Sequence, residues 1–257
     1  MRLNAWTDIF ENRAVLTLLK IVGLTYVGFM FVAPVIQGRG DWDYIQAVWD
    51  RWQSLNVGIL AFAASIIALS ISRISQRHQL QREFISARAL LPHALSELAG
   101  FCDECAAYFI EVHDAFTGWD SWLDLKTPLK QPPEIPTDIF PIFTQCIRTG
   151  ETHVAETLAQ LLSSLQVHRS RMHDLHLMPT RSSLRTANAA GLALDYLVAL
   201  ALIRANIDKA FDFARGEGSL DSTKPNQKEI RTAYAMMKVN PLIIDQVWER
   251  TQRFAKE

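Results

Sequence analysis

The chain has no excess of charge of either sign and few cysteines: 26 Lys and Arg stand against 27 Asp and Glu, with three cysteines among 257 residues. Without a basic excess, this is not the composition of a dedicated nucleic-acid-binding protein. The cysteine content is too low for a disulfide-stapled scaffold, and an apolar content of 49% is too high for a disordered chain. The overall composition is typical of a globular protein.

Common catalytic and ligand-binding motifs are also missing. The sequence has no glycine-rich phosphate loop, no HExxH zinc motif, no GxSxG nucleophile motif and no EF-hand loop. Nucleotide, zinc-protease, serine-hydrolase and calcium chemistries therefore have no support, and no motif is specific enough to name a reaction.

Two long apolar runs lie in the first ninety residues. Residues 14–36 contain one charge, Lys20, and would form a helix of about 34 Å, enough to cross a hydrocarbon core of about 30 Å. Residues 55–72 are uncharged and match the lower length limit of a span. The alternative is a cleaved signal peptide before a buried helix, but the first run is longer than a signal peptide's apolar region. We predict a transmembrane helix in each run.

The two spans divide the chain into five predicted segments. They are an N-terminal interfacial segment (1–13), a first span (14–36), a short outer loop (37–54), a second span (55–72) and a cytoplasmic α-helical domain (73–257). Arginines gather after the second span, whereas the outer loop carries two arginines beside three aspartates. Because positive charge favours the cytoplasmic side, we expect both termini in the cytoplasm of a bacterial-type cell and the spans in its inner membrane.

Aromatic and basic side chains near the span ends are typical of membrane interfaces. The predicted lipid-facing or interfacial residues are Trp6, Lys20, Trp42, Trp49, Trp52, Arg73, Arg77 and Arg82. A tryptophan ring can bury its body and keep its polar edge wet. The lysine lies near the inner end of the first span, so its stem can carry the charge to the interface, although a charge inside a span can also mark a functional site.

Small residues recur on one side of the second span. Ala61, Ser65, Ala68 and Ser72 form a strip that would allow another helix to approach closely. We expect the first span as the partner, with self-association of two copies as the alternative.

Beyond residue 73 the sequence is helical in character. We expect the second span to continue as a helix bent near Pro92, then a proline-rich connection over 117–141 and helices near 141–177, 186–214 and 227 to the C-terminus. The apolar stretch 189–203 resembles a third span, but Asp195 in its middle favours a central bundle helix. The predicted fold class is all-α: a two-helix transmembrane hairpin followed by an antiparallel helical bundle in the cytoplasm.

Two pairs of residues have the spacing of metal ligands. Cys102 and Cys105 form a CxxC pair, and His173 and His176 lie one turn apart on another predicted helix. Together they would complete a tetrahedral zinc set. Because the CxxC lies in mid-helix, we favour buried thiols, and we expect no metal and no cofactor.

The segment Arg171-Met-His-Asp-Leu-His176 is similar to the motif of the HEPN ribonucleases, an all-helical family in which an arginine is followed four to six residues later by a histidine. The resemblance implies that Arg171 would hold a phosphate while His176 moves a proton. Met172 stands where the family usually has a polar residue, and the same spacing recurs elsewhere in the chain.

The sequence thus predicts a membrane-anchored helical protein that acts as an interaction, scaffolding or signalling module without catalysis of its own. Its expected partners are the lipid bilayer and a protein or second copy that binds the cytoplasmic domain, with no nucleic acid. The alternative is a membrane effector, either a tethered HEPN-like ribonuclease or an oligomer that permeabilises the membrane through the strip of residues 61–72.

Overall fold

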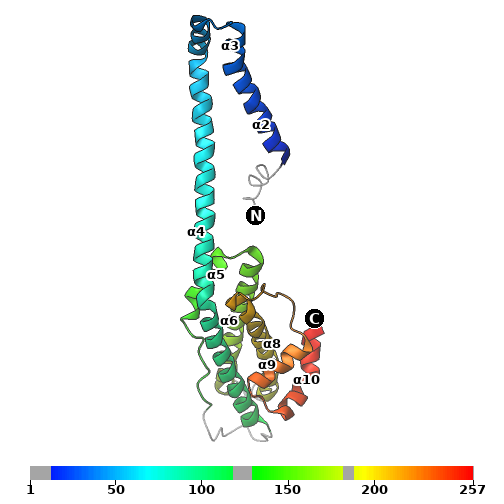
Figure 1. Cartoon of the computed structure of the whole chain (residues 1–257). Coiled ribbons are helices and arrows are strands. Elements are labelled where there is room, and N and C mark those ends of the chain that lie inside the picture. The colour runs from blue at the N-terminus through cyan, green and yellow to red at the C-terminus, as the bar shows by residue number, and fades with distance from the viewer. Residues whose placement is uncertain (1–12, 118–128, 182–187, 257) are drawn as a thin grey trace. The chain divides into compact units, whose positions relative to one another are not determined.

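The computed structural model describes residues 13–117, 129–181 and 188–256. Within these ranges the regular structure is entirely helical, which confirms the all-α class. The chain divides into two compact units, residues 1–75 and residues 76–257 (Figure 1). One helix, α4 (Trp42–Phe116), contributes residues to both units.

The first unit is a helical hairpin. Its first arm consists of α2 (Arg13–Val27), a π-helical turn η1 (Gly28–Val32) and α3 (Ala33–Gln37). Its second arm is the N-terminal part of α4, which lies beside α2 in Figure 1.

A tight turn joins the two arms. Arg39 and Gly40 both have positive φ, 49° and 90°, and so reverse the chain within four residues. The Asp41 carboxylate then accepts a hydrogen bond from the Asp43 backbone N–H at 3.0 Å, which caps the start of α4. Helix α4 thus begins at Trp42, and residues 42–54, which we predicted as part of an outer loop, are helical.

The second unit is a helical bundle. It contains the C-terminal part of α4 with α5 (Ile139–Thr149), α6 (Thr152–Arg181), α8 (Ala189–Arg215), α9 (Gln227–Met236) and α10 (Pro241–Lys256). Helix α8 is apolar around most of its circumference and packs against α6, α9 and α10 (Figure 1). Fully buried residues from α4, α6 and α8, such as Phe109, Leu165 and Leu197, share one core.

Local sequence sets the ends of these helices. Gly216 adopts φ 82° after α8, and its backbone N–H donates to the Phe213 carbonyl at 3.0 Å, so the helix ends there. Asn226 and Glu229 form a reciprocal capping box at the start of α9. Pro92 lies inside α4, which continues as a helix on both sides of it.

Candidate functional site

Three apolar helices in the described chain are long enough to cross a membrane, judged by length and composition alone. They are the helical stretch Lys20–Gln37, helix α4 and helix α8. None of the most apolar window of α4 is buried inside the protein, whereas 56% of the corresponding window of α8 is buried. The apolar surface of α8 is therefore largely covered by protein, and that of α4 is not.

Hydrogen bonds between polar groups join the two arms of the hairpin. The Tyr26 hydroxyl on α2 donates a hydrogen bond to Asn56 Oδ1 on α4 at 2.5 Å. Nearer the turn, Trp49 Nε1 donates to the Met30 carbonyl in η1 at 3.0 Å. Such pairing is what a lipid environment demands, because buried polar groups there have no water to bind.

The predicted interfacial tryptophans differ in their surroundings. Trp49 packs between Phe31 and Trp42, with ring centroids 6.1 and 6.0 Å away. Trp42 and Trp52 remain largely exposed near the turn. Trp6 lies outside the described residues.

The strip of small residues on α4 is exposed at all four positions, Ala61, Ser65, Ala68 and Ser72. The partly buried residues of this arm include Asn56, and the strip lies roughly 120° to 180° around the helix from it. The Ser65 hydroxyl donates to the Ala61 carbonyl within the same helix at 2.8 Å. The strip thus faces away from the side chain that bonds to α2.

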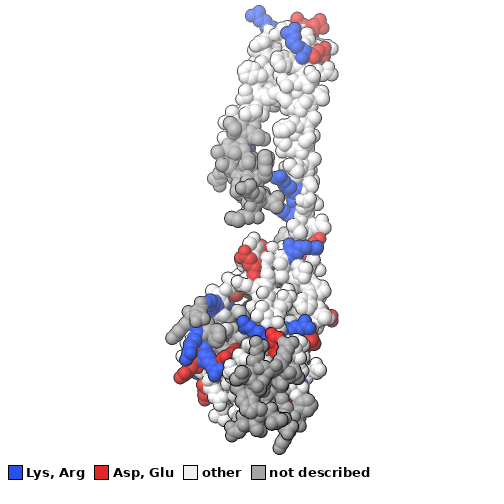
Figure 2. Space-filling model, turned by 180° about the vertical axis from the view of Figure 1, so that it is seen from behind, with Lys and Arg blue, Asp and Glu red and all other residues white. Residues whose placement is uncertain are grey.

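Charged residues are sparse along the hairpin. On the face shown in Figure 2, its charged side chains gather at the turn, and a long uncharged stretch of α4 follows. Within the hairpin, Lys20 is exposed and Arg73 is partly exposed; Arg77 and Arg82, which follow on α4 in the second unit, are exposed. Among the described residues, none of the three arginines has an acidic partner within ion-pair distance.

The residues of the HEPN-like segment contact different aromatic side chains. The Arg171 guanidinium lies over the Tyr196 ring of α8, 5.9 Å from its centroid. His176 Nδ1 lies 3.3 Å from the Tyr108 hydroxyl of α4. Met172, between them in sequence, is fully buried in the core. Each polar side chain is thus held against a different helix of the bundle.

The cysteines of the CxxC pair are fully buried in the core. Burial raises the pKa of the Cys102 thiol to about 12 and also raises the pKa of Cys105. Both thiols therefore stay protonated at neutral pH, which disfavours metal binding. In the part of the chain that the structure describes, no three His, Cys, Asp or Glu side chains are grouped to hold a metal ion, so Cys102, Cys105, His173 and His176 form no such group.

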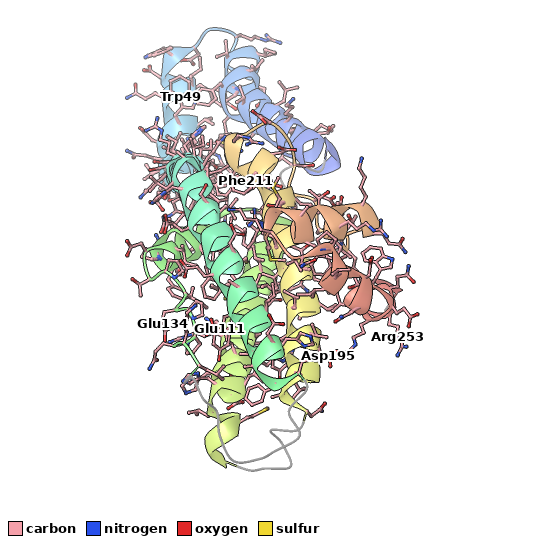
Figure 3. The ribbon with its side chains drawn as sticks, turned by 90° about the horizontal axis from the view of Figure 1, so that it is seen from below. Trp49, Glu111, Glu134, Asp195, Phe211 and Arg253 are labelled. Atoms are coloured by element: carbon pink, nitrogen blue, oxygen red, sulfur yellow. The ribbon has the colours of Figure 1, made fainter. Side chains whose placement is uncertain are left out.

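Sequence reasoning missed the polar contacts that hold α8 in place. Arg204 is largely buried and donates to Asp103 of α4 at 2.7 Å and to Asp208 at 3.0 Å. Asp195, labelled in Figure 3 on α8 near α10, accepts a hydrogen bond from Arg250 of α10 at 2.7 Å. The only sequence signal was the presence of charges in an apolar helix.

Comparisons with protein-family models, with curated proteins and with solved structures find no match for the chain.

Proposed function

We propose that the hairpin anchors the protein in a membrane, the inner membrane of a bacterial-type cell, and that residues 73–257 form a cytoplasmic module for interaction, scaffolding or signalling. The main support for this proposal is the most apolar stretch of α4, which no other part of the described chain buries. Leu60, Phe62 and Ile67 are each at least 60% exposed. Covering such a side chain with apolar surroundings gains roughly 1.5–3 kcal/mol, and a bilayer supplies that cover along the whole helix.

The contrast between the hairpin and α8 favours two spans over three. The charged side chains of α8 have protein partners: Asp195 pairs with Arg250, and Arg204 pairs with Asp103. Moving α8 into lipid would separate these pairs and leave charges in hydrocarbon at a cost of several kcal/mol. Retaining α8 in the bundle avoids that cost.

Basic residues that follow the apolar stretch of α4 and aromatic residues at the hairpin turn support a cytoplasmic bundle. Arg73, Arg77 and Arg82 follow the apolar stretch of α4 and have no acidic partner among the described residues, so they are available to anionic headgroups. At the turn, the exposed Trp42 and Trp52 rings suit the outer headgroup region.

Membrane anchoring is tested by alkaline carbonate washing of membranes from cells that express the full chain. We expect the protein to stay in the membrane pellet. The double variant Leu60→Arg/Ile67→Arg should be released to a large extent, because an arginine at the centre of a span costs about 2.5–3.5 kcal/mol.

The matched control is the double variant Met236→Arg/Leu242→Arg, which adds the same two charges at exposed apolar side chains of α9 and α10. It should leave the protein in the pellet. Release of the unaltered protein, or full retention of the double variant, would contradict the proposal.

A further inference from the structure

A shallow groove of about 540 Å³ lies on the bundle surface between α9 and α10. We call it the α9–α10 groove. Its lining residues are Gln227, Lys228, Arg231, Thr232, Ala235 and Trp248. Two of the six are cationic and none is acidic, so the lining of the groove carries a net positive charge.

The packing of α9 against α10 holds the residues that line the groove in position. The Tyr234 and Thr251 hydroxyls form a buried hydrogen bond of 3.0 Å between α9 and α10. Val247, next to the groove tryptophan, is fully buried. The capping box at Asn226 fixes the start of α9 one turn before Arg231.

Arg231 is the central cation of the groove. Its guanidinium carbon lies over the Trp248 ring, 4.2 Å from the ring centroid. A guanidinium in such a cation–π contact can keep N–H donors at its edge to bind a carboxylate through two hydrogen bonds. Lys228 lies one helical turn away on α9 and is exposed. Neither cation forms an ion pair with a described residue.

The charge of the surroundings indicates which anion fits. Residues 76–257 contain 20 Lys and Arg against 22 Asp and Glu, so the basic groove lies in a slightly acidic unit. A nucleic acid needs an extended basic surface, and an anionic membrane is bound by clusters of about four to eight basic residues. Two cations within a slightly acidic unit are instead suited to binding two separate carboxylates.

We infer that the α9–α10 groove binds an acidic segment of a partner protein. One carboxylate pairs with the edge of the Arg231 guanidinium and a second pairs with Lys228. The aliphatic parts of the segment lie over Ala235 and the Trp248 ring. This inference rests on the proposed interaction role and assigns that role a surface and a partner chemistry.

The test uses the full chain in nanodiscs of neutral phosphatidylcholine, with a fluorescein-labelled octaglutamate peptide as the probe and fluorescence anisotropy as the readout. Arg231→Gln and Lys228→Gln should each weaken binding about threefold to fivefold. Arg231→Lys should also weaken it, because lysine keeps the charge but loses the planar donors. Lys130→Gln, which removes an equal charge from an 81% exposed side chain outside the groove, is the matched control and should change binding less than twofold.

Equal binding by Arg231→Gln and the unaltered protein would overturn the inference, as would an equal loss of binding in Lys130→Gln. Tighter binding of an oligouridylate RNA that the same groove variants abolish would assign the groove to nucleic acid instead. If Arg231→Gln loses its helical circular dichroism, Lys228→Gln decides the test, because Lys228 is outside the cation–π contact. Failure of membrane anchoring would be seen in the carbonate wash and would leave peptide binding intact, so the two failures are distinguishable.

Discussion

His168 is a histidine in an apolar environment. Its side chain is on α6, its exposed fraction is 1%, and neither ring nitrogen has a hydrogen-bond partner among the described residues. The ring meets the Phe109 ring of α4 edge to face, with centroids 5.2 Å apart. Burial, together with the nearby positive charge of Arg171, lowers the pKa of His168 from 6.5 to about 4.

This shift predicts that the bundle loses stability in mild acid. Below pH 6.5 the unfolded chain binds a proton at His168 that the folded chain does not bind until about pH 4. The free energy of unfolding should therefore fall as pH drops through this window, by about 2 kcal/mol between pH 7.5 and pH 5. Urea unfolding of the protein in detergent, followed by circular dichroism at both pH values, measures the change.

His168→Leu should remove most of this pH dependence, because leucine fills the apolar site without titrating. His153→Gln is the control, since the imidazole of His153 is about half exposed beside Glu151. A pH dependence that persists in His168→Leu, or that disappears equally in His153→Gln, would show that another group is responsible.

A hydrogen bond from the Tyr26 hydroxyl to Asn56 Oδ1 joins the two arms of the hairpin. Tyr26→Phe removes the donor to Asn56 and leaves the amide without that partner. We expect the hairpin to lose about 1 kcal/mol of stability, measured by sodium dodecyl sulfate titration in mixed micelles with tryptophan fluorescence as the readout.

Ser70→Ala provides the matched control for the hairpin, because the Ser70 hydroxyl donates only to the Ile66 carbonyl of its own helix. The double variant Tyr26→Phe/Asn56→Leu should recover part of the loss, because it removes both polar partners. Equal effects of Tyr26→Phe and Ser70→Ala would mean that the bond between the arms contributes no stability of its own.

The helices were predictable where apolar residues run without interruption, as in residues 55–72. The start of α4 was not, because Asp43, Asp50 and Arg51 gave residues 42–54 the composition of a loop. Ile45 and Trp49 nevertheless recur at helical spacing, and both pack within the hairpin. The helical spacing of these apolar residues would have identified this part of the helix, whereas its content of charged residues led us to predict a loop.

The contacts of the candidate sites were less predictable. Arg204 and Asp103 are 101 positions apart, and only the folded bundle brings them within 2.7 Å. The same limit applies to the contact of Arg231 with Trp248, which brings together two helices. Local sequence indicates which residue types are present, but it does not indicate which distant helix faces them.

The proposed topology of the whole molecule is a hairpin that spans the membrane, with its turn outside and the bundle in the cytoplasm. The native cysteines are poor reporters of this topology, because Cys102, Cys105 and Cys146 are all buried. Asp43 near the turn and Ser163 on α6 are exposed, so cysteines introduced there can react.

The most direct measurement is labelling of Asp43→Cys and Ser163→Cys, each in the full chain, with a thiol reagent that does not cross the inner membrane. In intact cells with a permeabilised outer envelope, we predict labelling of the cysteine at 43 and none at 163 until the inner membrane is opened. Labelling at 163 in intact cells, or protection at 43, would contradict the proposed topology and the cytoplasmic role built on it.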